Sequence, residues 1–402
     1  MRATYPAETM QLRALARTGL MATGTFWFVT AVLGQTLFAL AVATFYGSAA
    51  WRGDALAWNR FMTGGYLEAH PASNGIVAVH IIAAVVLMLS GALQLTPLAR
   101  RLAPRLHRWN GRVYLAAAAG ASLAGLYMVW VRGTPGDLPQ HLGLSLNALL
   151  ILAFAAMALR RAMQRQIRAH QLWALRLFVV ASGVWFFRLG VLLAFALFGH
   201  PVGFNPRTFT GPFLTVMTFA QTLLPLAVLE LYIWARDHGG ARARFAAAGG
   251  LFMLTMVMAG GIAVNAAGLW LPEIISPFAS RQPVAVPMSI AIAKGGAGAG
   301  IAKYIALRNT QPDKFDFGED QVNGLGYQMI HSRRVSDAAA VFTFGTQVFP
   351  HSANLFDSLG EAYADLGDTA RAVLSYRKSL ALNPANENAA DALRELMQGS
   401  TP

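Results

Sequence analysis

Long apolar stretches separated by short polar segments make up the first two thirds of the chain. A helix needs about 20 predominantly apolar residues to cross a bilayer. Stretches of that length cover approximately residues 18–46, 75–98, 112–131, 141–159, 172–198, 213–235 and 245–271. The pattern therefore predicts an all-α fold in which residues 1–271 form a polytopic bundle of about seven transmembrane helices.

The pattern changes after residue 271. Residues 272–287 contain four prolines, which is typical of an irregular linker. Residues 290–308 contain several glycines, whose cost in a helix is about 1 kcal/mol each, but packing can offset that cost. We therefore expect a linker and a lead-in helix over residues 272–320.

Residues 321–398 repeat with a period of 34. Leu325-Gly326 aligns with Leu359-Gly360, and Phe342 aligns with Tyr376, each offset by 34 residues. This is the period of tetratricopeptide repeats, and the segment SLGEAYADLGDTARAVLSYRKSLALNPAN matches their pattern. The repeats predict a C-terminal domain of α-hairpins that docks a protein partner on its concave face.

The composition agrees with a membrane protein. The chain has 402 residues, of which 55% are hydrophobic and 13% charged, about half the charged share of soluble domains. The net charge is +13. The arginines lie in short connections between spans and form no basic–aromatic domain, so we expect no nucleic-acid partner.

The arginines also predict an orientation. The N-terminal tail and the connections at 99–112, 160–170 and 236–244 hold 15 arginines, and the alternate connections hold four. The positive-inside rule then places the N-terminus in the cytoplasm and the repeat domain on the external, or periplasmic, side of a bacterial inner membrane. The first apolar run is expected to be an uncleaved anchor.

Candidate chemistry lies in four histidines near the ends of successive spans. His80 and His141 are expected near one face of the membrane, and His107 and His170 near the other. Ionisable groups at membrane depth are costly and usually functional. Two imidazoles from facing helices can hold a haem iron, so the pairs His107–His170 and His80–His141 are candidate ligands for one or two b-type haems. The chain contains no cysteine, so a thioether-linked haem is excluded.

Arginines near these histidines are candidates for binding the haem propionates. Arg108 and Arg112 lie one turn apart and beside His107, and Arg176 lies further into the fifth span. The alternative is that all three are interfacial residues that follow the positive-inside rule. Arg188 lies 18 residues after His170, about 27 Å along a helix, and could neutralise an outer propionate or form a structural ion pair.

One resemblance covers about a quarter of the chain. The segments VHIIAAVVLMLSGALQL, LHRWNGRVY and RAHQLWALRLF, within residues 79–189, resemble a bacterial family of predicted membrane proteins catalogued as domain of unknown function 2306. The family motif falls on the following residues: His80, His107, Arg108, Gly111, Arg112, Tyr114, His170, Trp173 and Arg176. His141 is not part of that motif. The alternation of the histidines resembles the diheme b-561 cytochromes, in which helix two pairs with helix four and helix three with helix five.

Three hypotheses follow. The first is a transmembrane electron carrier with b-type haem, which would make the chain a membrane oxidoreductase if it is an enzyme. The second is a non-catalytic membrane anchor whose tetratricopeptide domain acts as a scaffold. The third is a small-solute transporter, which inverted repeats would support, and the sequence has no convincing ones.

Overall fold

The computed structural model of the chain is almost entirely helical, which confirms the all-α prediction. It describes residues 7–53, 55–62, 64–67, 70–199, 201–205, 209–275 and 281–398. The contacts divide the chain into two compact units. Unit 1 comprises Met1–Trp51 and Met62–Pro277, and unit 2 comprises Arg52–Phe61 and Phe278–Pro402.

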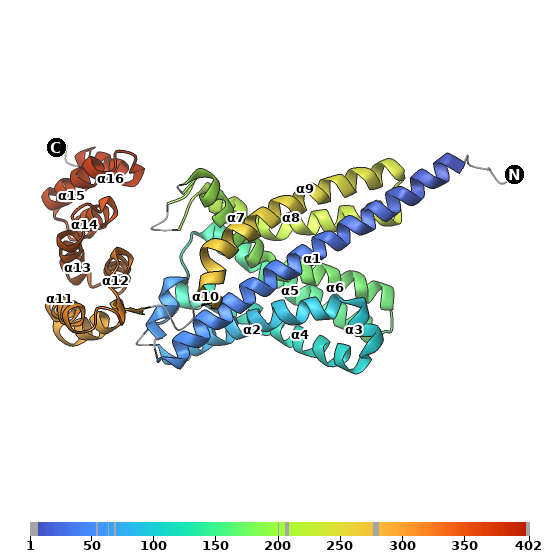
Figure 1. The fold of residues 1–402 in the computed structure, drawn as a ribbon, viewed down its shortest axis with the longest axis horizontal. Helices are drawn as coiled ribbons and strands as arrows, with labels where there is room; N and C mark the ends of the chain where they lie inside the picture. Colours follow the sequence, from blue (N-terminus) through green and yellow to red (C-terminus); the bar gives the residue numbers. More distant parts are fainter. Residues whose placement is uncertain are drawn as a thin grey trace. The chain divides into compact units, whose positions relative to one another are not determined.

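Unit 1 is a bundle of long helices (Figure 1). They are α1 (Ala7–Trp51), α2 (Pro71–Leu95), α3 (Pro97–Leu102), α4 (Pro104–Tyr127), α5 (Leu138–Met163), α6 (Ile167–Ala181), α7 (Gly183–Phe198), α8 (Pro212–Asp237), α9 (Ala241–Asn265) and α10 (Leu271–Ile275). Two π-helical turns, η2 (Met128–Gly133) and η3 (Ala266–Trp270), continue α4 and α9. Figure 1 shows α1 lying along α9 for much of its length, and the two helices pack against each other.

Within the described residues, seven helices are long and apolar enough to cross a membrane, and the bent pair α6–α7 is an eighth candidate. Seven of these eight belong to unit 1 and coincide with the predicted spans. The chain is therefore a multi-pass membrane protein. The other candidate is α11 (Ala285–Thr310) of unit 2, which is interrupted by non-helical backbone at Gly295 and Gly296.

Four of the helices form a ring. The neighbours in it are α2 with α4, α4 with α5, α5 with α6, and α6 with α2. α4 and α6 are therefore diagonal partners, and so are α2 and α5. The inside of the ring is filled mainly by small and aliphatic side chains around Tyr114. The buried members are Ala83, Leu87, Tyr114, Ala117, Ala118, Ile151, Ala155, Leu177 and Val180.

The span expected to run unbroken over residues 172–198 is two helices, α6 and α7, that meet at Ser182 with a bend of 40°. Backbone groups freed at a break inside a membrane need new partners. Asn147 on α5 donates its amide to the Val180 carbonyl at 2.9 Å. The Ser182 hydroxyl accepts from Gln35 on α1 at 2.8 Å. Polar side chains from two other helices thus stabilise the bend.

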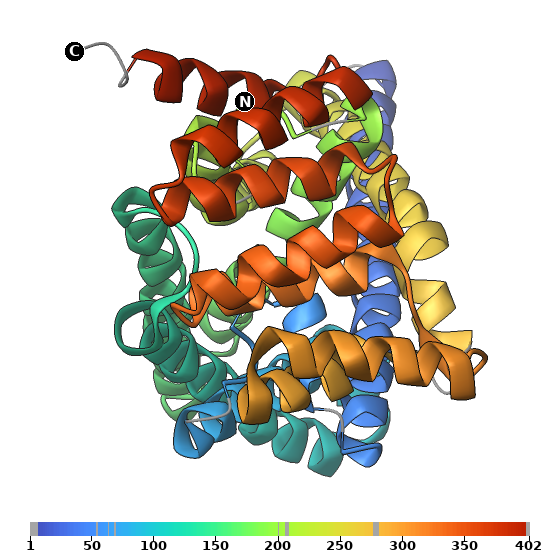
Figure 2. The same cartoon turned by 90° about the vertical axis from the view of Figure 1, so that its left-hand side faces the viewer.

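Unit 2 contains α11, α12 (Glu319–His331), α13 (Val335–Val348), α14 (Ala353–Asp365), α15 (Thr369–Leu382) and α16 (Glu387–Gln398). A short 3-10 helix, η1 (Ala55–Arg60), and two parallel two-residue strands, β1 (Gln282–Pro283) and β2 (Phe315–Asp316), complete it. Figure 2 shows the helices of this unit as successive layers. The buried residues of α11, including Met288, Ile292 and Tyr304, share one apolar core with α12, α13 and α14.

One contact in unit 2 occurs twice, 34 residues apart. A methyl group added to Gly326 of α12 would collide with the ring of Phe342 on α13. A methyl group added to Gly360 of α14 would lie 2.8 Å from the ring of Tyr376 on α15. The sequence period of 34 is therefore also a period in packing, in which a glycine on the first helix of each hairpin admits an aromatic ring from the second.

Candidate functional site

His80 and His170 each hydrogen-bond through Nδ1 to a backbone carbonyl of a neighbouring helix. Nδ1 of His80 on α2 lies 2.9 Å from the Ala121 carbonyl oxygen of α4. Nδ1 of His170 on α6 lies 2.9 Å from the Ala158 carbonyl oxygen of α5. A carbonyl oxygen only accepts, so each Nδ1 must carry the hydrogen. In the neutral ring, Nε2 then has the lone pair and is the atom available to bind a metal.

His107 lies in a polar cluster at the start of α4. Its Nε2 lies 3.5 Å from the Gln94 side-chain nitrogen. The Gln94 oxygen accepts from Asn110 at 3.0 Å, which directs the NH₂ group of Gln94 towards the histidine. Nδ1 of His107 is buried and has no hydrogen-bond partner. A buried polar atom without a hydrogen-bond partner is rare in native interiors and needs an explanation.

The inner pair, His107 and His170, lies on diagonal helices of the ring, α4 and α6. The two rings are close enough to interact electrostatically. Among the interactions of the described residues, no hydrogen bond or ring contact joins these two imidazoles, so the pairing of His107 with His170 stays a prediction. Two facing imidazoles satisfy the axial coordination of a haem iron. The described residues contain no cluster of three or more His, Cys, Asp or Glu side chains that could hold a bare metal ion.

The outer pair, His80 and His141, also lies on diagonal helices, α2 and α5. Among the interactions of the described residues, none joins His80 to His141. His141 instead directs Nε2 to the Thr134 carbonyl at 3.1 Å, and its ring meets Trp130 edge-on. The His80 ring lies against Gly125, where an added methyl group would be 3.5 Å from Cε1.

The two histidine levels are well separated. Ala121, which binds His80, follows His107 on the same helix by 14 residues, or about 21 Å. The apolar core around Tyr114 fills the ring between the two levels. The inside of the ring between the two levels is therefore apolar, although the buried Asn147 of α5 makes polar contacts with α6 and α8 beside it.

The arginines assigned to propionates have varied surroundings. Arg176 forms a bidentate ion pair with Glu230 of α8, with Nε–Oε1 2.6 Å and Nη2–Oε2 2.8 Å, and stacks on Trp173. The pair forms because α6 and α8 pack together and place these two side chains against each other. Arg112 stacks on Trp109 with its guanidinium 4.8 Å from the ring centre. Arg108 lies within electrostatic range of His107.

Arg188 on α7 has no ion pair among the described residues, so the structural ion pair offered as one alternative does not form there. Its guanidinium lies 5.7 Å from the centre of the Phe38 ring. Tyr46 and His80 are its electrostatic neighbours. A cation in this position would favour an anionic group beside His80.

The sequence analysis missed the polar side chains that order this site. Gln94 contacts His107 and is itself bound by Asn110, and Asn147 stabilises the break between α6 and α7. A methyl group on Gly183 would lie 2.7 Å from the Asn147 amide nitrogen, so a glycine is needed where Asn147 approaches. The available signal was the rarity of amide side chains inside apolar spans.

Comparison with known proteins agrees with part of the sequence analysis. Residues 77–224 match the model of a family described as Predicted membrane protein (DUF2306). No curated protein matches the chain. The matched stretch runs from α2 into α8 and includes all four histidines of the candidate site. The resemblance noted over residues 79–189 is thereby confirmed and extended, and this part of the multi-pass membrane protein is similar to the DUF2306 family.

Proposed function

We propose that unit 1 holds a b-type haem between His107 and His170 and transfers electrons within or across the membrane. The observation that supports this proposal is the placement of the two histidines on diagonal helices at one end of the bundle, with the Nδ1 of His170 bound to a carbonyl so that its Nε2 is available. When bound, a haem supplies reversible one-electron chemistry at its iron. The residues present fit that group.

Each residue of the inner site would have a distinct role in binding the haem. The Nδ1 bond of His170 to Ala158 fixes the ring orientation and leaves Nε2 for the iron. Nε2 of His107 faces the Gln94 NH₂ group, so His107 would have to release Gln94 to bind the iron through Nε2. Arg108 and Arg112 lie on the same helix as His107 and would bind propionates, whereas Arg176 already binds Glu230. The apolar ring interior would keep water from the buried side of the site.

A second haem between His80 and His141 would complete the arrangement typical of diheme b-561 cytochromes. His80 has the same Nδ1 geometry as His170, and the cationic Arg188 lies nearby. His141 would have to bind through Nδ1 or release Thr134. The inner site is therefore the better supported of the two.

The test is the absorbance of the full chain, expressed with a haem precursor and purified in detergent. We expect a red protein with a Soret band that sharpens on reduction. His170→Ala should remove the inner haem, whereas His238→Ala, at the end of α8, should leave the spectrum unchanged. A colourless wild-type protein would overturn the proposal, and an unchanged spectrum in His170→Ala would overturn the ligand assignment.

We also propose that unit 2 is a tetratricopeptide domain that docks a protein segment, which is the basis of the scaffold hypothesis. The repeated glycine–aromatic contact supports it. So does a hollow of about 530 Å³ within unit 2, lined in part by Thr343, Gln347 and Arg371. Truncation of residues 323–402 should leave membrane insertion and the haem spectrum intact but abolish partner binding. If partner binding survives the truncation, the docking proposal is wrong.

The orientation in a bacterial inner membrane is likewise a proposal, carried by the distribution of arginines. Because the chain has no cysteine, single cysteines can report it without background. Glu387→Cys in unit 2 should react with a membrane-impermeant thiol reagent on spheroplasts, and Gly240→Cys between α8 and α9 should react only after lysis. The reverse result would invert the topology.

A further inference from the structure

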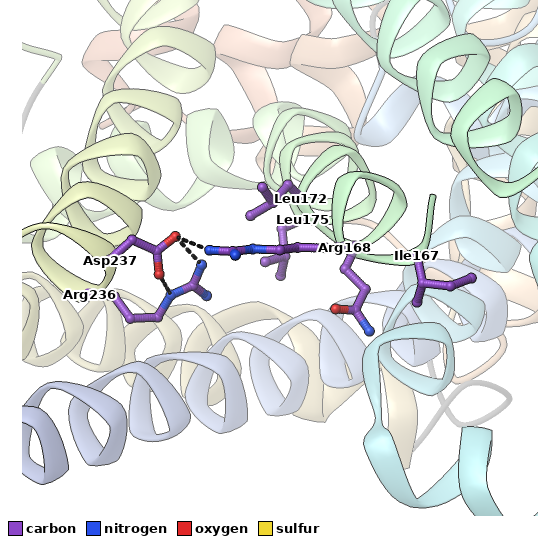
Figure 3. Close-up of a pocket in the computed structure, with 7 residues that line it drawn as sticks. Ile167, Arg168, Leu172, Leu175, Arg236 and Asp237 are labelled. Carbon is purple, nitrogen blue, oxygen red and sulfur yellow. Dashed lines mark hydrogen bonds and ion pairs between the residues drawn. The ribbon is translucent and has the colours of Figure 1, made fainter. Parts of the chain in front are cut away.

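A hollow opens between α6 and α8 at the end of the bundle where the arginine-rich connections lie (Figure 3). Its volume is about 590 Å³. It is lined by Ile167, Arg168, Gln171, Leu172, Leu175, Arg236 and Asp237. It belongs to unit 1, and none of the residues assigned to the haem lines it.

The lining changes from polar to apolar along α6. Arg168, Gln171, Leu172 and Leu175 follow the spacing i, i+3, i+4, i+7, so they share one face of the helix. Arg168 lies in the first turn of α6, and Leu172 and Leu175 lie one and two turns further into the membrane. The lining is charged at the end of the bundle and aliphatic deeper in the membrane. A phospholipid has the same order, with a charged head group at the surface and acyl chains below it.

The charges in the hollow do not cancel. Asp237 binds Arg236 through two contacts, at 2.8 and 3.1 Å. Arg168 makes only one contact with the same carboxylate, at 3.4 Å, and its side chain is 81% exposed. Figure 3 shows both guanidinium groups converging on Asp237. Two arginines and one carboxylate leave a single positive charge, carried mainly by the loosely held Arg168.

We propose that this hollow binds the head group of a phospholipid with one net negative charge, such as phosphatidylglycerol. The phosphodiester would bind Arg168, with Gln171 as a further hydrogen-bond donor, and an acyl chain would cover Leu172 and Leu175. Basic pockets between transmembrane helices are general sites for anionic head groups. The net charge of the hollow matches one phosphodiester monoanion. This inference does not depend on haem binding.

The first test counts lipids retained by the delipidated full chain, using native mass spectrometry after addition of phosphatidylglycerol or phosphatidylcholine. We expect one phosphatidylglycerol bound in preference to phosphatidylcholine. Arg168→Gln should weaken the binding about fivefold, because it removes one cationic contact with phosphate. The control, Arg242→Gln, removes an exposed arginine near the start of α9 that does not line the hollow, and should change nothing.

A second variant distinguishes loss of the lipid site from unfolding of the protein. Asp237→Asn removes the carboxylate that competes for both arginines, so it should strengthen phosphatidylglycerol binding, a gain that a misfolded protein cannot give. Equal retention of the two lipids, equal losses in Arg168→Gln and Arg242→Gln, or weaker binding in Asp237→Asn would each overturn the proposal. Displacement of the lipid by millimolar inorganic phosphate would also overturn it, because the site would then recognise free phosphate.

Discussion

Arg176 on α6 and Glu230 on α8 form a fork-to-fork ion pair across the bundle, with nitrogen–oxygen distances of 2.6 and 2.8 Å. The Arg176 side chain is 20% exposed, and its guanidinium also lies 4.8 Å from the centre of the Trp173 ring. Planar, bidentate pairing is the geometry in which arginine and lysine are not interchangeable. The pair therefore fixes the register of α6, which carries His170, against α8.

We expect Arg176 and Glu230 to be energetically coupled. Arg176→Met and Glu230→Gln should each lower the free energy of unfolding in detergent micelles, because each change leaves an unpaired charge. The double variant should lose less than the sum, with a coupling energy of about 1–3 kcal/mol. Arg242→Met serves as the control for loss of a cation. Strictly additive losses would show that the pair contributes nothing to stability.

The close approach of the Phe342 ring to Gly326 can be tested by comparing alanine substitutions at Gly326 and at Gly324, two residues earlier on α12. Gly326→Ala should destabilise the α12–α13 hairpin by about 1–3 kcal/mol, because its methyl group would collide with Phe342. Gly324→Ala, on the same helix, meets nothing within 4 Å and should be neutral or stabilising by up to about 1 kcal/mol. Hydrogen–deuterium exchange of α12 and α13 in the full chain measures both. Similar exchange in the two variants would contradict the packing.

Asp368 makes unit 2 sensitive to acid. It caps α15 by accepting from the Arg371 backbone nitrogen at 3.0 Å, and it also pairs with the Arg371 side chain. These bonds, the backbone bond first, lower the pKa of Asp368 below its ordinary value of 3.8. The ionised cap therefore stabilises the folded state fully above pH 3.8, and this contribution is lost as the pH falls through the lowered pKa of the folded protein.

The measurement is the protection of the first turn of α15 from hydrogen exchange as the pH falls below 3.8. The wild-type chain should lose protection. Asp368→Asn keeps a capping oxygen without a titrating charge, so its protection should change little over the same range. If both proteins respond alike, another group is responsible for the acid sensitivity.

Arg132 holds the connection before α2 in place. Its guanidinium donates to the Gly64 carbonyl at 2.6 and 3.0 Å, to the Gly65 carbonyl at 3.2 Å and to Asn74 Oδ1 at 3.0 Å. Arg132→Lys cannot reproduce this fork and should increase hydrogen exchange of the backbone at 64–67 by an order of magnitude or more. Trp130→Phe, in the same π-helical turn, should not. Unchanged exchange in Arg132→Lys would show that the connection is held by other contacts.

The apolar pattern determined most of the architecture, because segments of sufficient apolar length have one stable location, a helix across the bilayer. It identified the seven spans of unit 1. The repeated residues identified the 34-residue period, which recurs as the contacts of Gly326 with Phe342 and of Gly360 with Tyr376. The apolar pattern did not identify the bend at Ser182, because the side chains that stabilise the bend come from α1, which binds the Ser182 hydroxyl, and from α5, which binds the Val180 carbonyl.

For the candidate site, too, some features could be predicted from the sequence and others only from the tertiary structure. The sequence named His107 and His170, since rare ionisable residues in apolar segments are visible in one dimension. Only the tertiary structure decided that the two lie on diagonal helices, that Gln94 faces His107, and that Arg176 is bound to Glu230. These relationships depend on how each helix is rotated about its axis, and that rotation is set by packing against neighbours far away in the chain.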